Sequence, residues 1–151
     1  MMHMKITVGE LIAVVLILAA LSLGFLGATP TTSSYSLSPI SASVISKYLG
    51  GRWSINYVYI GSGYYAKIQT LQQYKNSEVL YENLTDSLGD ELIILYVYPY
   101  HGQAMNYHNG FISLVAMNNG NAYIMLSYIG NSTTVSQARL QALANYIISS
   151  E

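Results

Sequence analysis

The sequence predicts an α+β domain in which helices cover a small antiparallel sheet, placed after an N-terminal transmembrane helix and a Ser/Thr/Pro stalk. Three observations predict it: an uncharged apolar run from Leu11 to Ala28, a preferred hairpin turn at Asn119-Gly120, and a capping box at Thr134 and Gln137 that begins a C-terminal helix. The expected order of helix, one or two strands, helix, strand, hairpin and helix indicates an α+β domain. The expected divisions are a short cytoplasmic N-terminus (1–10), the anchor (11–28), the stalk (29–38) and an external domain (39–151).

The apolar run is long enough to cross a membrane as a helix. From Leu11 to Ala28 it extends about 27 Å, against about 30 Å for the hydrocarbon core of a bilayer. Lys5 precedes the run and no charge follows until Lys47, so the domain should lie outside the cell membrane. The alternative is a cleaved signal peptide, because the small residues at Gly27 and Ala28 suit a cleavage site.

The same region resembles the N-terminus of archaeal type IV pilins, which have a short basic leader, a glycine and a long apolar helix. Lys5, Gly9, Glu10 and the run from Leu11 carry the resemblance, although no basic residue directly precedes Gly9. The resemblance implies a filament subunit whose N-terminal helices pack together. Further along, the segment from Asn109 to Ile148 resembles the closing hairpin and helix of small extracytoplasmic domains in bacterial lipoproteins and anti-sigma factors, and the composition resembles surface proteins of hot-spring crenarchaea.

Composition argues against several functions. Charged residues make up 9% of the 151 residues, against about 25% in ordinary soluble domains, and the formal net charge is -1. Six Lys and Arg residues cannot form the basic surface that nucleic acid requires. The absence of cysteine excludes disulfides, thiolate catalysis and Cys-based metal sites. Because no nucleophile elbow and no Gly-rich phosphate loop occurs either, we expect no enzyme and no cofactor.

The first half of the external domain should contain a short helix and one or two strands. Ser38 and Pro39 suit the cap and first turn of a helix that Gly50 ends. Alternation from Trp53 to Tyr59 then predicts a strand that Gly61 and Gly63 interrupt. The segment from Tyr64 to Leu71 fits a second strand or a helix, and we favour the strand.

Between Ser77 and Leu88 the spacing of four residues predicts a helix. Its carboxylates would form a solvated stripe, and its leucines would lie on the opposite side. The members of these two stripes are Glu78, Glu82, Asp86 and Asp90 on one side, and Leu80, Leu84 and Leu88 on the other.

The second half should hold a buried strand, a hairpin and the C-terminal helix. The stretch from Leu92 to Tyr98 is apolar on both faces, as in a central strand. A type I′ turn at Asn119-Gly120 would direct one face of the hairpin to the core. This turn pairs Met117 with Ala122, Val115 with Ile124 and Phe111 with Tyr128. The final helix should bury Leu140, Leu143 and Ile147.

One polar and aromatic segment, between the buried strand and the hairpin, is the candidate site. It consists of Tyr98, Tyr100, His101, Asn106, Tyr107 and His108. The spacing of its two histidines does not match a zinc site, so no metal is expected. Clustered Tyr and His side chains suit a small ligand or a protein partner, and an ordinary polar loop is the alternative. Fifteen tyrosines could likewise form a contact face between identical subunits.

These observations together predict a single-pass membrane protein with a non-catalytic binding or assembly domain outside the cell. The sequons at Asn83 and Asn131 fit that location, and Asn131 is the better candidate for N-glycosylation because it lies in an expected turn. Its partner would be a protein or a copy of itself. The alternatives are a pilin-like filament subunit and an accessory subunit of a membrane complex.

Overall fold

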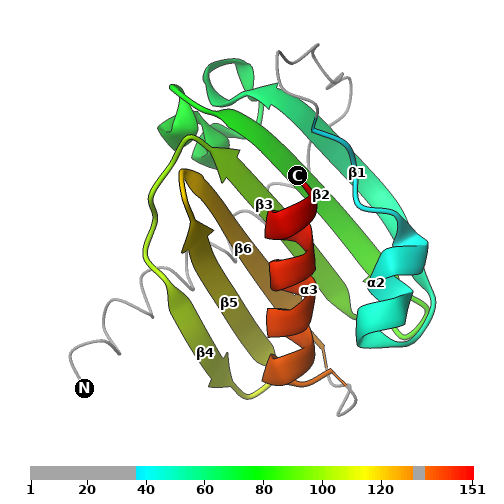
Figure 1. Cartoon of the computed structure of the whole chain (residues 1–151). Helices are drawn as coiled ribbons and strands as arrows, with labels where there is room; N and C mark the ends of the chain where they lie inside the picture. The colour runs from blue at the N-terminus through cyan, green and yellow to red at the C-terminus, as the bar shows by residue number, and fades with distance from the viewer. Residues whose placement is uncertain (1–36, 131–134) are drawn as a thin grey trace.

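The computed structural model describes residues 37–130 and 135–151, which form a six-stranded antiparallel sheet with two α-helices against one face (Figure 1). The strand order is β1-β2-β3-β6-β5-β4, so β1 and β4 are the edges. The elements are α2 (Ala42–Leu49), β1 (Trp53–Ser62), the 3-10 helices η1 (Gly63–Tyr65) and η2 (Gln69–Tyr74), β2 (Glu78–Asp86), β3 (Glu91–Tyr98), β4 (Met105–Asn109), β5 (Ile112–Asn119), β6 (Ala122–Ile129) and α3 (Gln137–Ser150).

The expected α+β class, with an antiparallel sheet and a final helix, is confirmed. The expected anchor, the stalk up to Ser36, Thr134 and Asn131 lie outside the described residues. Within the described part, no helix has both the length and the apolar character to cross a membrane.

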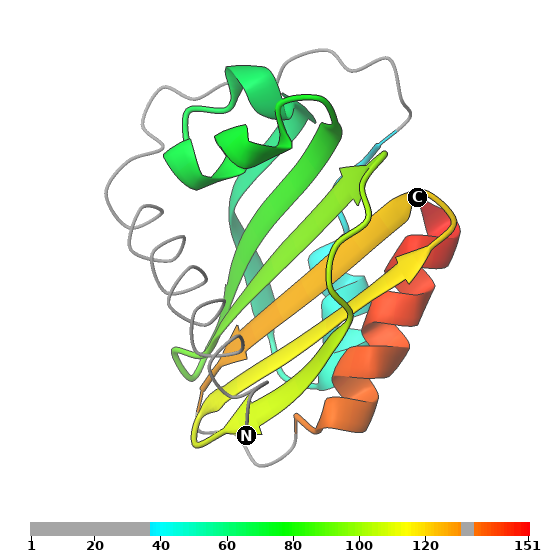
Figure 2. The same ribbon diagram turned by 90° about the vertical axis from the view of Figure 1, so that its left-hand side faces the viewer.

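Helices α2 and α3 pack side by side on one face of the sheet, which we call the helix face (Figures 1 and 2). Ile45 and Leu49 from α2 meet Leu143 and Ile147 from α3 over the apolar side chains of the central strands. The sheet contributes Leu80, Leu84, Leu92, Ile94, Ile124 and Leu126 to this core. Leu140, Leu143 and Ile147 are fully buried, which confirms the apolar stripe expected on the C-terminal helix.

The opposite face of the sheet, which we call the second face, carries its own apolar cluster. The segment that contains η1 and η2 packs against this cluster. Figure 2 shows that segment over one end of the strands. Strands β2 and β3 are therefore buried on both sides, as expected for β3. The strand residues of this cluster are Tyr57, Tyr59, Val79, Tyr81, Ile93, Leu95, Val97, Leu114, Ala116, Tyr123 and Met125.

Helix α2 begins later than expected. Its cap is Ser41, whose hydroxyl accepts the Val44 amide at 3.3 Å, so the expected start at Ser38 and Pro39 is wrong. The preceding backbone has other partners, because the amides of Ser38 and Ile40 donate to carboxylates of the folded domain. Gly50 ends the helix with φ 75°, as expected for a glycine stop.

Strand β1 is confirmed, but the residues from Trp53 to Tyr59 do not all follow the simple alternation that the sequence predicts. The register with β2 shifts between Ile55 and Tyr57, which marks a β-bulge at this edge of the sheet. Trp53 therefore joins the helix-face core, whereas Tyr57 joins the second face and Ile55 is 40% exposed. Alternation alone cannot reveal a bulge, because one extra residue reverses the facing of every residue after it.

The second strand expected from Tyr64 to Leu71 is wrong, because this segment folds into η1 and η2. Gly63 begins the turn and lies so close to Tyr74 that an added Cβ would be 2.2 Å from the Tyr74 carbonyl oxygen. The Gly63 amide also donates to the Ser77 carbonyl at 3.0 Å. The chain between Gly63 and Ser77 therefore closes on itself in short 3-10 turns and does not pair along β1.

The helix expected between Ser77 and Leu88 is also wrong, because the chain forms β2. A spacing of four residues is even, so it keeps side chains on one face of a strand as well as on one side of a helix. Leu80 and Leu84 consequently face α2 and α3, and Glu82 lies between them, fully buried. Leu88 is 78% exposed in the turn between β2 and β3. The acidic stripe is therefore not a solvated face.

The β5–β6 hairpin is confirmed with a different register. Val115 pairs with Leu126 and Met117 with Ile124, which moves the expected pairing by two residues and keeps the same faces. The expected type I′ turn at Asn119-Gly120 is wrong: the turn residues are Gly120, with φ 61°, and Asn121, whose φ is not positive, which is the glycine placement of a type II′ turn. Phe111 is 56% exposed in the preceding turn, so its expected place on the core face is wrong.

Candidate functional site

The segment expected to be a contact loop contains an edge strand. After β3 the chain passes through the cis peptide bond between Tyr98 and Pro99, runs along the end of the sheet and forms β4. Strand β4 pairs with β5 through a two-residue turn of Gly110, with φ 61°, and Phe111. Thus Asn106, Tyr107 and His108 belong to regular structure rather than to a loop.

The six candidate residues do not gather at one point. Tyr98 packs against the helix-face core, and Asn106 and His108 are placed on that side by their pairing with Val115 and Ser113. Tyr100 and Tyr107 pack against the second face. The sheet therefore separates the set into two groups, and no single pocket brings them together.

Tyr100 has a packing role. Its ring lies 4.9 Å from that of Tyr74 and 5.4 Å from that of Tyr123, both in edge-to-face geometry, so it links η2 to the sheet. Its amide donates to the Asn121 carbonyl at 2.8 Å. Asn118 also fixes the connection between β3 and β4. Its side-chain Oδ1 accepts the Gly102 N–H at 3.1 Å, and its Nδ2 donates to the Gly102 carbonyl at 2.7 Å.

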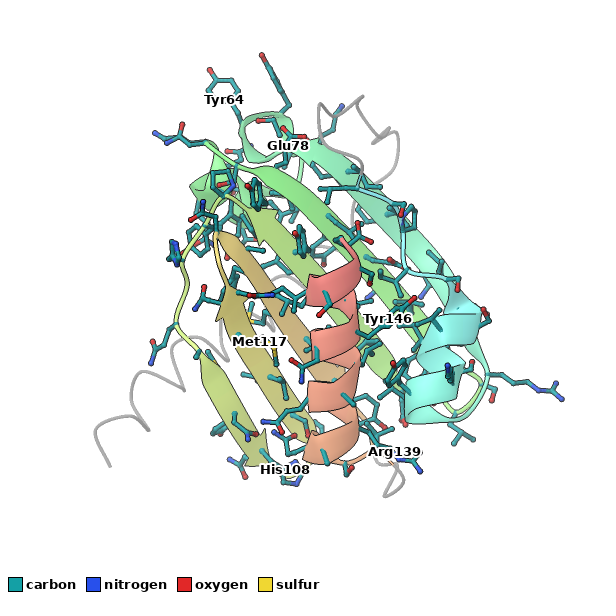
Figure 3. All side chains as sticks on the ribbon, viewed as in Figure 1. Tyr64, Glu78, His108, Met117, Arg139 and Tyr146 are labelled. Atoms are coloured by element: carbon teal, nitrogen blue, oxygen red, sulfur yellow. The ribbon has the colours of Figure 1, made fainter. Side chains whose placement is uncertain are left out.

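The two histidines lie at opposite ends of β5. His101 Nε2 is 3.1 Å from Asn121 Oδ1 at the β5–β6 turn, whereas His108 Nδ1 is 2.8 Å from Ser113 Oγ near the start of β5. Figure 3 shows His108 at the end of the sheet far from Tyr64 and Glu78. Among the described residues no three His, Asp or Glu side chains are close enough to hold a metal ion.

The outer side of β4 is an open sheet edge, which we call the β4 edge. Asn109 and Ile112 flank the two-residue turn and form a hydrogen-bonded pair, so by antiparallel alternation Tyr107 and Met105 also bond to β5. The backbone N–H and C=O groups of Asn106 and His108 therefore point away from the sheet. No described backbone group pairs with them on that side.

The β4 edge lacks three features that protect an edge strand against pairing. Proteins protect edge strands with lysine, proline or a bulge, and β4 has uncharged side chains, no proline and a continuous register with β5. Gln137 at the start of α3 steadies the strand, since its Nε2 donates to Asn106 Oδ1 at 2.5 Å and to the Tyr107 carbonyl at 3.2 Å. The arrangement suits capture of an extended segment by backbone pairing.

Two carboxylates hold the first described residues, Leu37–Ser41, which we call the neck. Glu82 Oε1 accepts the Ile40 amide at 2.8 Å, and Glu151 Oε1 accepts the Ser38 amide at 3.1 Å. Burial, with a smaller contribution from Glu151, raises the pKa of Glu82 to about 7, and burial also raises the pKa of Glu151. Glu82 Oε2 is buried with no hydrogen-bond partner. The sequence does not reveal these two contacts, because they join residues that are 42 and 113 positions apart.

The described sequon asparagine is part of the sheet. Asn83 lies on β2, 3% exposed, and its Oδ1 accepts the Asn56 side-chain amide at 3.0 Å. A glycan at this position would have to displace β1 or the second-face cluster. Asn131 therefore stays the preferred candidate for N-glycosylation.

Comparison of the chain with protein-family models, with curated proteins and with solved structures finds no match.

Proposed function

We propose that the chain is a single-pass, membrane-anchored protein whose extracytoplasmic domain acts by binding or assembly and not by catalysis. The uncharged run from Leu11 to Ala28 and the position of Lys5 support the anchor and its orientation. The residues from Thr29 to Ser36, rich in Ser and Thr, suit a stalk.

The observation that carries the binding role is the β4 edge. Asn106 and His108 present backbone donors and acceptors outward, and the side chains around them are polar or aromatic without charge. Among the described residues no three His, Asp or Glu side chains gather at one point, and the neighbouring Glu82 and Glu151 carboxyl groups accept backbone amides of the neck. This distribution favours a contact protein over an enzyme.

Charged substitutions in the apolar run test the anchor. Replacing Leu18 and Leu21 with Arg places two charges at the centre of the proposed span, and each costs about 2.5–3.5 kcal/mol of insertion free energy. We expect the full-length protein in the membrane fraction after alkaline washing and the double variant outside it. The matched control Ser34→Arg, in the expected stalk, should stay with the membrane. Recovery of the unaltered protein in the aqueous fraction would overturn the proposal.

The N-terminus of the mature protein separates the anchor from the filament subunit that the pilin resemblance implies. Protein sequencing that starts at Met1 or Met2 supports the retained anchor, whereas a start at Glu10 supports a processed pilin-like subunit.

A further inference from the structure

We propose that the partner of the β4 edge is a second copy of this chain, and that two β4 strands pair antiparallel about a two-fold axis at Tyr107. This inference rests on the proposed membrane-anchored function and names its partner. The pairing would join two six-stranded sheets into one continuous sheet, with the helix faces of both copies on the same side.

The backbone of β4 is complementary to itself in this register. With Tyr107 opposite its own counterpart, Asn106 lies opposite His108 of the second copy, and His108 opposite Asn106. These are the two residues whose N–H and C=O groups point away from β5. Each pair exchanges two hydrogen bonds, so the interface satisfies every outward backbone group at Asn106 and His108. A register moved along the strand would leave part of this short strand without a partner.

The side chains also suit the two-fold arrangement. Tyr107 falls in a non-hydrogen-bonded pair, where side chains approach most closely, so the two rings meet on the second face. Met105, half-buried beside the same cluster, lies opposite Asn109 of the second copy. On the helix face, His108 uses Nδ1 toward Ser113, so Nε2 is the ring nitrogen that could contact the second copy. Strand β4 contains no Lys, Arg, Asp or Glu, so pairing it with a second copy brings no like charges together.

The other edge of the sheet is less suited to this role. Strand β1 carries the bulge near Asn56, and bulges twist an edge away from regular pairing. Strand β4 keeps one register with β5 over its full length. The geometry therefore selects the β4 edge for association.

An interface of one short strand is weak in dilute solution. Confinement of both copies to a membrane raises their effective concentration, as linking two modules does, and favours pairing without any additional contact. The dimer should therefore form in membranes, where the anchor holds both domains at the same height.

Disulfide cross-linking of the full-length protein in its membranes tests the register. The chain has no cysteine, so Tyr107→Cys introduces a single thiol per copy. In a non-hydrogen-bonded antiparallel pair the two Cα atoms are about 4.5 Å apart, within the about 4.4–6.8 Å that a disulfide spans. In the matched control His108→Cys, each position 108 lies opposite residue 106 of the other copy, so the two Cα atoms at position 108 are farther apart than the about 7 Å limit for a disulfide.

We expect oxidation to convert most of the Tyr107→Cys protein to a covalent dimer, with several-fold less dimer for His108→Cys. Adding Asn106→Pro to Tyr107→Cys should abolish the dimer, since proline is tolerated where an edge N–H faces outward but cannot donate to a second copy. Equal cross-linking at 107 and 108, or none at either, overturns the inference.

Amide hydrogen exchange on the unaltered protein keeps the test independent of any folding defect in the Tyr107 variant. The N–H groups of Asn106 and His108 should be protected in membranes and lose protection when detergent dilutes the protein. Rapid exchange of both amides in membranes contradicts the pairing. If the protein stays in the membrane but neither amide is protected, the inference fails while the proposed anchor stands; loss from the membrane fraction instead rejects the proposed function.

Discussion

At the scale of single residues, Glu82 shows how burial changes the protonation of a carboxyl group. It lies between Leu80 and Leu84 under the helix-face core, fully buried, with one oxygen on the Ile40 amide and the other without a partner. An ionised carboxylate is costly in such a place, and this cost raises its pKa to about 7. The neck therefore depends on a carboxyl group that titrates near neutrality.

Stability should fall as pH rises through this range. The pKa of Glu82 in the folded state, about 7, is above its ordinary value of 4.5, so the folded state binds the proton more tightly than the unfolded state. The stabilisation is complete below about pH 4.5 and is lost by about pH 8, a change of roughly 3 kcal/mol. Thermal unfolding at pH 5 and pH 8 measures it.

Glu82→Gln should reduce this pH dependence, because the amide oxygen still accepts the Ile40 N–H and carries no proton to lose. Glu91→Gln, on the neighbouring strand, is the matched control and should keep the dependence. If unaltered protein and Glu82→Gln lose the same stability between pH 5 and pH 8, the assignment to Glu82 is wrong.

At the scale of elements, local patterns identify some segments and fail where distant contacts decide. The apolar run of β3 and the stripe of α3 are predictable, since burial on both faces or on one side leaves a clear sequence pattern. Strand β2 is not, because its spacing of four fits a helix side and a strand face equally. The polar segment Met105–Asn109 forms strand β4 because it pairs with β5, and its own hydropathy pattern does not predict a strand.

The candidate site is likewise predictable only in part from the sequence. The sequence identifies the polar segment, and part of this segment forms the β4 edge. Its backbone role follows from alternation with β5, which sequence alone does not provide, and the separation of His101 from His108 follows from the extended chain between them.

Two leucines of the expected helical stripe distinguish strand from helix. In a helix, Leu84 and Leu88 would share one buried side, whereas in this fold Leu84 is fully buried and Leu88 is 78% exposed. Leu84→Asp should therefore destabilise the domain by more than about 3 kcal/mol, because it buries an unpaired carboxylate. Leu88→Asp should change stability by less than about 0.5 kcal/mol. Denaturant unfolding of both variants measures the difference, and similar losses would contradict the strand assignment.

At the scale of the whole molecule, the packed helix face and the open β4 edge lie on different parts of the fold. Helices α2 and α3 bury the helix face, the bulge disturbs the β1 edge, and β4 is left available for pairing. The neck, where the described chain begins, is fastened to β2 and to the end of α3 by Glu82 and Glu151. These two hydrogen bonds hold residues 37–41 against the folded domain.

The central claim, a domain held outside the cell by an N-terminal span, is tested most directly by thiol labelling in intact cells. Phe111→Cys places the single thiol of the chain at an exposed turn of the domain, and the control Thr7→Cys places it before the proposed span. We expect a membrane-impermeant thiol reagent to label Phe111→Cys in intact cells and Thr7→Cys only after permeabilisation, with both proteins in the membrane fraction. Protection of Phe111→Cys until the cells are opened, or labelling of Thr7→Cys in intact cells, would contradict the account.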